Sequence, residues 1–410
     1  MPAPARFNDK PFPYHHELTL EVETLTNLGV GLGRVDGWVV MVPFALPGES
    51  VRARVFRNHA NYSQADLVEV LRSSPARRAP ACPLFGDCGG CQYQHLEYAQ
   101  QLAWKTRQVR EVFARLGGLP EADIRPAHPS PREYHYRSKL TPHYERPRPD
   151  SSFPIGFLRA GRRVLVDVLQ CPIATEAVNA ALPATRAALA ARAATLKRGG
   201  TLLLREVGAP GQTRVVTDPR ATVTAAIGDT TFQFQAGDFF QNNPFILPEL
   251  VDYVLAEAAG AGAKFLLDVY CGAGVFALCG RHRFTQCLGV EVNADAVLRA
   301  IENASRNDAA NCVFRTGAAE TIFAGVKFLA AETAVILDPP RAGCDEPFLR
   351  QLIAYAPARI VYVSCDPATQ ARDIKILAAS GYRLLHAQPF DLFPQTRHIE
   401  NVATMEKVSY

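Results

Sequence analysis

The last third of the chain repeats one pattern, and this pattern constrains the fold more than any other feature. Short apolar runs rich in β-branched residues alternate with spacers of helical periodicity. Such runs predict buried strands, and their alternation with helices is typical of a doubly wound parallel sheet. The predicted strands span residues 265–270, 286–291, 311–314, 334–338 and 359–364. Two further runs, 382–386 and 401–407, are separated only by a loop, so we expect them to pair antiparallel at one edge of a seven-stranded mixed sheet.

Reactive side chains stand where these predicted strands begin or end. Asp338 ends one strand, Cys365 follows another, and Glu400 precedes the last. In an open α/β sheet, chemistry takes place beyond the carboxyl ends of the strands. A thiol there can act as a nucleophile if a neighbour lowers its pKa or accepts its proton. An isolated cysteine at a strand end is more often a small core residue, but the two neighbouring carboxylates favour a reaction centre.

A glycine-rich turn follows the first predicted strand, with Asp268 just before it and Gly272 and Gly274 within it. A nicotinamide-binding turn is one interpretation, but the third glycine of that fingerprint is missing. Asp268 instead suits S-adenosylmethionine, whose amino and carboxylate groups meet backbone and acidic groups in such a turn. Glu291 ends the next strand, where its carboxylate can accept both ribose hydroxyls. The sequence therefore favours an S-adenosylmethionine site.

Cysteine spacing indicates a metal site near the start of the chain. Cys82, Cys88 and Cys91 lie within ten residues, separated by glycines, and Cys171 before a proline is the best fourth ligand. Ten cysteines in a chain that reads as cytosolic favour metal or catalytic use over disulfides. Four thiolates suit either zinc or an iron–sulfur cluster. Zinc is the default on spacing, although this chain supplies a single CxxC unit instead of two.

The pattern of residues 16–73 predicts a small β-barrel, because apolar and polar residues alternate along short runs and a glycine-rich turn follows the first of them. Arginines and aromatic residues alternate on one expected surface, which suits an RNA backbone and stacked bases, although a solvated face explains the same pattern. These residues are Arg52, Arg54, Arg57, His59 and Tyr62.

Composition sets the broad class of protein. The 410 residues are 48% hydrophobic and 20% charged, which predicts a globular chain of two or three domains. The net charge of +4 is too small to indicate nucleic acid by itself. The start of the chain does not read as a signal peptide, and no apolar run is long enough to span a membrane. We expect a cytoplasmic monomer that does not enter membranes.

Taken together, these motifs resemble the RNA uracil-5-methyltransferase family, in particular its iron–sulfur branch that acts on 23S ribosomal RNA. The barrel resembles a TRAM domain, a small RNA-binding, OB-like barrel. The resemblance implies that Cys365 is the nucleophile and Glu400 the general base. It also implies that a 4Fe–4S cluster, and not zinc, is held by Cys82, Cys88, Cys91 and Cys171.

The resemblance further assigns the binding residues. Phe239 to Gln241 matches a phenylalanine–glutamine motif that touches both substrate and cofactor. The implied cofactor contacts are Gln241, Tyr270, Gly272, Gly274, Glu291 and Asp338, and the implied substrate contacts are Phe239, Arg137 and Asp338. Val275 and Ala318 depart from residues that relatives use, which puts individual cofactor contacts in doubt and not the activity.

The implied architecture has three domains. Residues 14–74 form the TRAM-like barrel, and residues 75–91 and 125–238 form a central α+β domain with the cluster. Residues 92–124 and 239–410 form the Rossmann-like α/β catalytic domain, which is discontinuous because the helix after the third cluster cysteine packs on it in the family.

We therefore expect an S-adenosylmethionine-dependent enzyme that forms 5-methyluridine at one site of 23S ribosomal RNA. The same reaction on transfer RNA is the first alternative, and a non-catalytic RNA-binding assembly factor on a methyltransferase scaffold is another. An adenine-amino methyltransferase is a third, because Asp338-Pro339-Pro340 imitates its motif. That motif needs an aromatic residue next, where this chain has Arg341, and it would leave Cys365 without a role.

Overall fold

The computed structural model describes residues 4, 7–147, 153–208, 213–317, 321–323 and 325–408, so Ala318 lies outside the described residues. The chain divides into two compact units, each described here by itself. The first comprises Met1–Trp104, Pro154–Val168 and Pro394–Arg397. The second comprises Lys105–Phe153, Leu169–Phe393 and His398–Tyr410.

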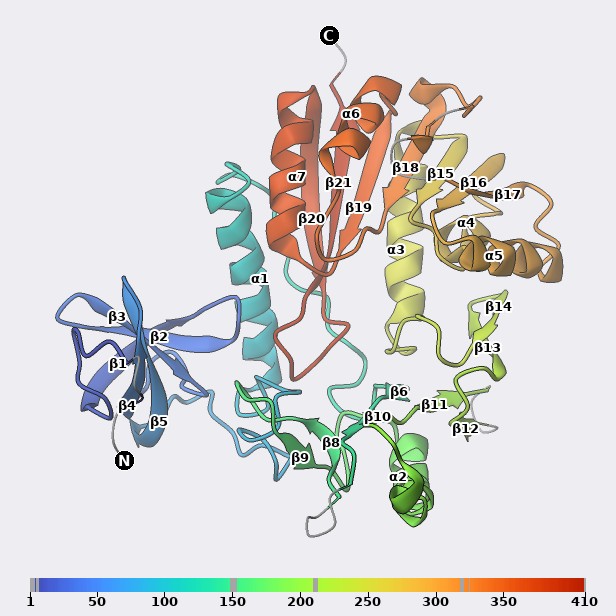
Figure 1. Cartoon of the computed structure of the whole chain (residues 1–410). Coiled ribbons are helices and arrows are strands. Elements are labelled where there is room, and N and C mark those ends of the chain that lie inside the picture. Colours follow the sequence, from blue (N-terminus) through green and yellow to red (C-terminus); the bar gives the residue numbers. More distant parts are fainter. Residues whose placement is uncertain are drawn as a thin grey trace. The chain divides into compact units, whose positions relative to one another are not determined.

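The first unit contains a closed barrel with strand order β1-β2-β3-β5-β4 (Figure 1). Its strands are β1 (Glu17–Leu25), β2 (Val30–Val35), β3 (Trp38–Pro43), β4 (Ser50–Asn58) and β5 (Tyr62–Arg72). Successive residues of a strand face opposite sides, so Leu18, Leu20 and Val22 enter the barrel core while Thr19 and Glu21 between them stay exposed. The predicted small barrel is confirmed.

Arg52 and Arg54 of the barrel surface are paired with acids, which the sequence pattern did not indicate. Arg52 lies 2.7 Å from Glu69 and 3.5 Å from Glu17, and Arg54 lies 3.2 Å from Glu17. Barrel residues 16–72 contain five arginines and seven acidic residues. Cross-strand glutamates therefore offset the charge of Arg52 and Arg54, so this face is less basic than the sequence pattern indicates. Exposed pairs of this kind add little stability.

The rest of the first unit is short. Strand β8 (Ile155–Leu158) pairs antiparallel with β9 (Leu165–Asp167). The helix α1 (Tyr98–Arg115) begins in this unit and continues in the second.

The second unit contains a seven-stranded sheet with order β17-β16-β15-β18-β19-β21-β20 (Figure 1). Neighbouring strands from β17 to β19 are parallel, whereas β21 is antiparallel to both β19 and β20. The strands are β15 (Phe265–Val269), β16 (Gln286–Glu291), β17 (Cys312–Thr316), β18 (Thr333–Leu337), β19 (Arg359–Ser364), β20 (Tyr382–Phe390) and β21 (Glu400–Lys407).

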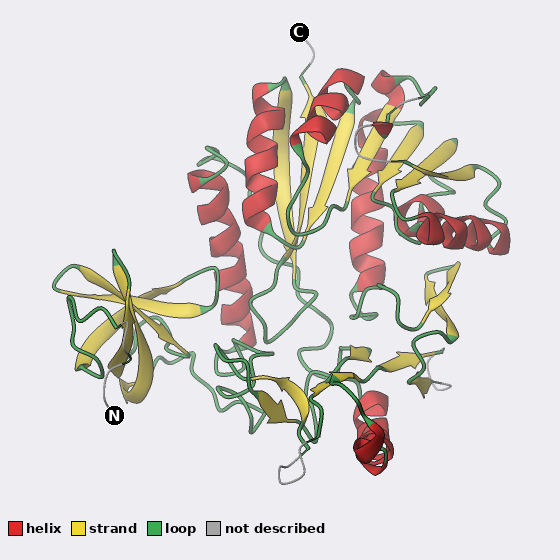
Figure 2. Cartoon of the chain, viewed as in Figure 1, coloured by secondary structure: helices red, strands yellow, loops and turns green. Residues whose placement is uncertain are grey.

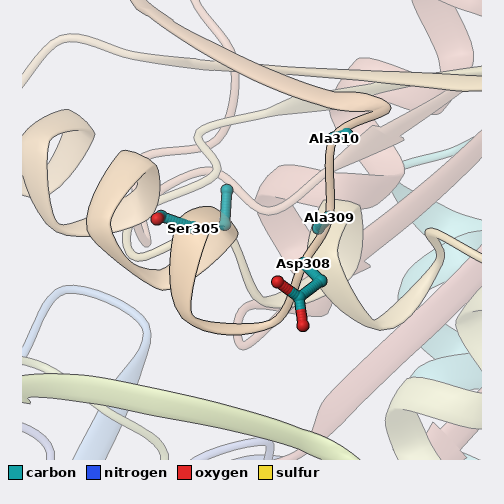
Figure 3. A pocket seen from close by; sticks show the side chains of 5 residues that line it. Ser305, Asp308, Ala309 and Ala310 are labelled. Atoms are coloured by element: carbon teal, nitrogen blue, oxygen red, sulfur yellow. The ribbon is translucent and has the colours of Figure 1, made fainter.

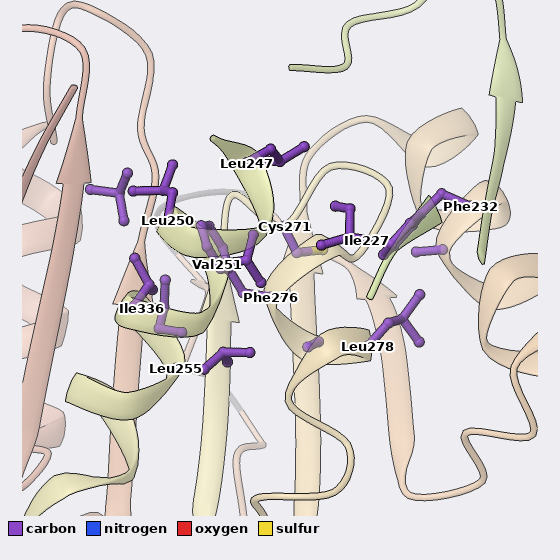
Figure 4. Packing of buried hydrophobic residues seen from close by; sticks show 14 of the residues in the cluster. Ile227, Phe232, Leu247, Leu250, Val251, Leu255, Cys271, Phe276, Leu278 and Ile336 are labelled. Atoms are coloured by element: carbon purple, nitrogen blue, oxygen red, sulfur yellow. The ribbon is translucent and has the colours of Figure 1, made fainter. Parts of the chain in front are cut away.

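Helices cover both faces of this sheet (Figure 2). The part of α1 from Lys105 on, α6 (Glu346–Tyr355) and α7 (Pro367–Ala379) pack on one face, and α3 (Leu247–Ala259), α4 (Val275–Cys279) and α5 (Ala294–Arg306) on the other. Every residue of β19 is buried because its alternate side chains enter the two different cores. Leucines of α3 pack beside Ile336 of β18 in one of them (Figure 4). No described helix is long and apolar enough to cross a membrane.

The second unit also contains an α+β region. It contains a three-stranded sheet, a further pairing of two short antiparallel strands, a hairpin and one Ala-rich helix. The strands are β6 (Lys139–Leu140), β11 (Leu204–Val207) and β12 (Arg214–Val216), then β7 (His143–Tyr144) with β10 (Gly200–Thr201), and β13 (Thr222–Ile227) with β14 (Thr230–Gln235). The helix is α2 (Glu176–Ala191), and 3-10 turns lie at Ala193–Thr195, Gly260–Gly262 and Ala330–Glu332.

A buried ion pair fastens α1 to the segment after β20. The Nζ atom of Lys105 lies 2.6 Å from Oδ1 of Asp391, and both side chains are fully buried. The same ammonium donates a hydrogen bond to the carbonyl oxygen of Phe393 at 3.3 Å. Removing one member of such a pair leaves the other charge buried, which is costly.

Asp391→Ala should therefore lower the free energy of unfolding by about 3–5 kcal/mol. Replacing both partners together, Lys105→Met with Asp391→Leu, should cost much less because no buried charge remains. Denaturant unfolding followed by circular dichroism measures both values. Lys264→Ala, which breaks the exposed pair with Glu332, is the control and should change stability by at most about 1 kcal/mol. Equal losses in the single and double variants would contradict this account.

Candidate active site

The carboxyl-end edge of the sheet brings Asp338, Cys365 and Glu400 together. Asp338 follows the last residue of β18, Cys365 follows the last residue of β19, and Glu400 opens β21. Because β21 runs antiparallel to β19 with Ser364 opposite Asn401, the next pair outward is Cys365 and Glu400. Strand pairing alone thus sets a thiol beside a carboxylate.

Hydrogen bonds at the start of α7 hold the backbone around Cys365 in place. Asp366 caps α7, its carboxylate accepting hydrogen bonds from the N–H groups of Ala368 at 2.9 Å and Thr369 at 3.3 Å. The fully buried amide of Gln370 donates to the carbonyl oxygens of Tyr362 in β19, at 2.7 Å, and Asn401 in β21, at 3.1 Å. These bonds connect the two strands, one residue from Glu400 in β21 and three residues from Cys365 in β19.

Arg341 completes this group, although in the sequence it stands out only as a departure from another motif. Its loop is held against α7, since the hydroxyl of Thr369 donates to the carbonyl oxygen of Arg341 at 3.1 Å. Arg372 of the same helix donates to the carbonyl oxygens of Ala342 at 3.0 Å and Cys344 at 3.1 Å. The signal in the sequence was a cation placed just after a strand-end carboxylate and two prolines.

The electrostatics of the site favour neutral acids. Burial raises the pKa of the Cys365 thiol, the Glu400 charge raises it further, and a hydrogen bond and the charge of Arg341 lower it. Burial also raises the pKa of Glu400 well above its usual range, with Asp338 adding to the rise and Arg341 opposing it. Burial raises the pKa of Asp338 to about 7. Arg341 is thus the group that favours the ionised forms of both Cys365 and Glu400.

The glycine-rich turn after β15 is held in an uncommon backbone conformation. Tyr270, Gly272 and Gly274 all have positive φ, of 64°, 52° and 84°. A Cβ atom at Gly274 would lie 2.8 Å from the ring of Phe314, whereas one at Gly272 would meet nothing within 4 Å. A left-handed tyrosine is strained, and such strain is found at functional sites. The turn therefore has a tightly packed side and an open side.

Two acids flank this turn. Glu291 accepts hydrogen bonds from the N–H groups of Gly272, at 3.2 Å, and Asn293, at 2.9 Å, so its carboxylate is fixed beside the turn and keeps lone pairs for another donor. Asp268 is fully buried, and one of its oxygens accepts from the N–H of Ala277 in α4 at 2.9 Å. The other, Oδ1, has no hydrogen-bond partner among the described residues, and burial raises the pKa of Asp268 to about 8. An orphaned buried oxygen and an open turn fit a ligand with an amino group and ribose hydroxyls.

The loop after β14 carries Phe239 and Gln241. Phe239 is 79% exposed, whereas the neighbouring Phe240 points inward and stacks on Phe234 with ring centroids 4.5 Å apart. The buried amide of Asn243 donates to the Ser130 hydroxyl at 3.1 Å and to the carbonyl oxygen of Leu392 at 3.0 Å. The loop thus presents one aromatic ring to solvent from a firmly anchored backbone.

Arg137 lies in the segment beside this loop. Its Nε donates to the carbonyl oxygen of Lys139 at 3.0 Å, and its own N–H donates to that of Ile173 at 2.8 Å. The next residue, Ser138, donates from its N–H to the carbonyl oxygen of Asn242 at 2.8 Å. Phe239, Gln241 and Arg137 therefore lie on two segments that the bond between Ser138 and Asn242 joins.

The structure does not support the predicted metal cluster. Cys82, Cys88 and Cys91 belong to the first unit and Cys171 to the second. All four are half-buried, and none forms a disulfide. Across the described ranges, no three His, Cys, Asp or Glu side chains gather in a way that could hold a metal ion.

A pocket at the end of α5 is not part of this site. Its lining consists mostly of small side chains, from Ala304, Ser305, Asp308, Ala309 and Ala310 (Figure 3). The chain passes from α5 into the amino end of β17, so this pocket lies at the edge of the sheet opposite Cys365. It contains none of the predicted site residues.

Comparison with known proteins adds sequence matches along most of the chain. The family described as tRNA (Uracil-5-)-methyltransferase matches residues 216–408, and the TRAM domain matches residues 16–68. The tRNA (uracil(54)-C(5))-methyltransferase of Schizosaccharomyces pombe is 40% identical over 97% of this chain and 80% of its own length. Its counterpart in Saccharomyces cerevisiae is 34% identical over 96% of this chain and 74% of its own length. An uncharacterized RNA methyltransferase of Halalkalibacterium halodurans is 31% identical over 94% of this chain and 96% of its own length.

One solved structure shares the fold over nearly the whole chain. It is the tRNA (uracil-54, C5)-methyltransferase of Pyrococcus abyssi in complex with S-adenosyl-L-homocysteine, with a TM-score of 0.73. The match covers 95% of this chain and 100% of that chain at 24% sequence identity, so it establishes a common fold and no more.

The role of Arg341 can be tested on the thiol itself. Because Arg341 lowers the pKa of Cys365, Arg341→Met should raise that pKa and move the pH dependence of Cys365 alkylation by iodoacetamide to higher pH, by about one unit. Mass spectrometry of the peptide that contains Cys365 separates this thiol from the others. Arg341→Lys should restore part of the shift, and Arg350→Met, on the exposed side of α6, should produce none. An unchanged profile in Arg341→Met would show that the arginine does not act on the thiol.

Proposed function

Because the chain belongs to the RNA uracil-5-methyltransferase family, we propose that it methylates carbon 5 of uridine in transfer RNA, with S-adenosylmethionine as methyl donor. The expectation of 23S ribosomal RNA is set aside, since the relatives of known substrate are named for uracil 54 of transfer RNA. Uridine 54 is accordingly the proposed target. The observation that carries the chemistry is the register of β21 on β19, which pairs the Cys365 thiol with the Glu400 carboxylate.

The residues of the turn fit the methyl donor. We assign Glu291 to its ribose hydroxyls and the open backbone at Gly272 and Gly274, beside Tyr270, to its amino-acid end. Gln241 and Asp338 would complete the contacts. When bound, S-adenosylmethionine supplies an electrophilic methyl group on a sulfonium.

Carbon 5 of uracil is a poor nucleophile, and addition of Cys365 to the ring makes it a better one. Addition of its sulfur to carbon 6 moves the electron pair of the ring double bond toward carbon 5 and the neighbouring carbonyl, forming an enolate. Arg341 aids this step by favouring the thiolate. Asp338 and Gln241 are assigned to the edge of the ring, which they hold by hydrogen bonds.

Glu400 completes the reaction. The enolate electron pair at carbon 5 would form the new bond to the methyl carbon, and the sulfonium sulfur would keep the pair of the broken S–CH3 bond and leave as a neutral thioether. Carbon 5 then carries both the methyl group and its proton, and the carboxylate of Glu400 accepts that proton. The electrons of the broken C–H bond re-form the ring double bond while the bond from carbon 6 to Cys365 breaks. A carboxylate whose pKa lies above its usual range is a stronger base, and burial provides that rise here.

The target base must leave its stack before Cys365 can reach it. Phe239 and Arg137 are assigned to hold the extruded nucleotide, the ring by stacking and the guanidinium by charge. An adenine-amino methyltransferase is disfavoured because neither the thiol nor Arg341 would have a function in it.

A suicide substrate tests the chemistry and the substrate together. A transfer RNA transcript with 5-fluorouridine at position 54 should form a covalent complex with the wild-type protein, because fluorine cannot leave as a cation. The complex should be visible on a denaturing gel. Cys365→Ala should form none, and Glu400→Gln should accumulate a methylated adduct on unmodified transcript. A complex with a fluorinated 23S ribosomal RNA fragment instead would reverse the choice of substrate, and no adduct with any RNA would favour the non-catalytic assembly factor.

The iron–sulfur cluster remains a proposal that rests on the thiol spacing and the family resemblance, and no step above depends on it. If it is correct, anaerobically purified protein should be brown and contain about four iron atoms per chain. Cys88→Ser should lose the iron, whereas Cys279→Ser, outside the proposed ligand set, should keep it. A colourless protein with one zinc per chain, or with no metal, would remove the cluster.

A further inference from the structure

Two cations lie directly opposite each other on the neighbouring strands β6 and β11. Lys139 and Arg205 are register partners in this antiparallel pair. Like charges in that position repel and destabilise a sheet. Arg205 is also only 4% exposed. Burial, followed by the charge of Arg205, lowers the pKa of Lys139 to about 8. Such an arrangement needs a compensating partner.

The partner is the backbone of the loop that carries Phe239. The Lys139 ammonium donates hydrogen bonds to the carbonyl oxygens of Gly237 at 3.0 Å and Asp238 at 3.1 Å. Arg205 Nη2 donates to the same Asp238 oxygen at 2.7 Å. Hydrogen bonds from cations are stronger than neutral ones. Both positive charges are therefore directed at the two residues immediately before Phe239.

The residues after Phe239 are anchored as well. Phe240 stacks on Phe234. The guanidinium of Arg205 lies over the Phe234 ring, 5.0 Å from its centre. Ser138 donates twice to the carbonyl oxygen of Asn242, from its N–H at 2.8 Å and from its hydroxyl at 3.0 Å. Between these anchors, Phe239 has the highest exposed fraction, 79%, of the large hydrophobic side chains described.

We infer that Lys139 and Arg205 are positioning residues that hold the Phe239 ring ready to stack on a nucleotide of the RNA substrate. The inference rests on the proposed function, because the RNA supplies the base that meets the ring. A loop ordered before binding loses less conformational freedom when the RNA arrives. The two cations thus act on RNA affinity through the backbone, without contacting RNA themselves.

The competing account is that Lys139 contacts a phosphate directly. The two accounts differ in two measurable ways. A phosphate contact would be independent of the Phe239 ring, and its loss would reduce the slope of log affinity against log salt by about 0.7–0.9. A positioning role would depend on the ring and would leave the salt slope unchanged.

A double-mutant cycle on methylation of the transfer RNA transcript decides between them. Lys139→Met should raise the KM for RNA about fivefold with kcat within twofold, as loss of part of a stacking contact predicts. Phe239→Ala should raise it about tenfold. In the Phe239→Ala background, Lys139→Met should add less than twofold. Lys139→Arg should restore most of the affinity, and Lys197→Met, at an exposed lysine of the same unit, should have no effect.

Lys139→Gln repeats the cycle with a side chain that can still donate a hydrogen bond, in case Lys139→Met does not fold. Fully multiplicative effects of Lys139→Met and Phe239→Ala, together with a reduced salt slope, would overturn the inference in favour of a phosphate contact. Failure of the wild-type protein to methylate any uridine would instead refute the proposed function, so the two failures are distinguishable.

Discussion

The antiparallel pairing of β21 with β19 is the constraint on which the candidate site depends. Side chains alternate along a strand, so a shift of the register by one residue would turn Glu400 to the opposite face of the sheet. The buried amide of Gln370 opposes such a shift, because it bonds to both strands beside the pair. The fully buried Asn401 returns a hydrogen bond of 2.6 Å to the same amide. The relation between thiol and carboxylate is therefore built into the sheet and needs no mobile loop.

The same sheet buries acidic groups whose pKa values rise as a result, and Arg341 opposes that rise at Cys365 and Glu400. Two carboxylates and a thiol in a poorly hydrated edge favour their neutral forms, which can neither attack a ring nor accept a proton. Arg341 lowers the pKa of both Cys365 and Glu400, and its loop is fastened by α7, the helix that starts just after Cys365. The Arg341 cation and the Cys365 thiol are thus held by one helix. A cation on a free loop would have to be ordered each time the site is used.

Sequence patterns predicted the central sheet closely and its polar details poorly. Apolar periodicity placed 286–291 and 359–364 where β16 and β19 lie, because a strand buried on both faces has few alternatives. The strand at residues 382–386 was too short, since β20 continues to Phe390 through His386, Gln388 and a proline, which read as a strand end. The glycine-rich turn and the strand-end acids were also predictable, because each follows an apolar run.

What the sequence could not predict depends on pairs of residues far apart in the chain. Arg52 and Arg54 read as a basic surface until the barrel closes and brings Glu17 and Glu69 beside them. Lys139 and Arg205 are 66 positions apart in number, and only the β6–β11 register makes them neighbours. Spacing along the chain predicts ligands for a cluster at Cys82, Cys88 and Cys91, but spacing does not fix where side chains gather.

The groups proposed for the reaction and those proposed for choosing the RNA lie on different elements of this molecule. In the proposed function, the thiol and the carboxylates that act on the base belong to the strand-end group, which the sheet and α7 hold in place. The barrel has more acidic residues than arginines, so attraction to phosphate is weak there and cannot by itself select an RNA. Selection then depends on shape and stacking, and the anchored loop with its exposed Phe239 is the described element suited to both. Under the proposed function, a change in this loop would alter the choice of RNA and leave the thiol, the two carboxylates and the arginine in place, because the sheet and α7 hold those groups.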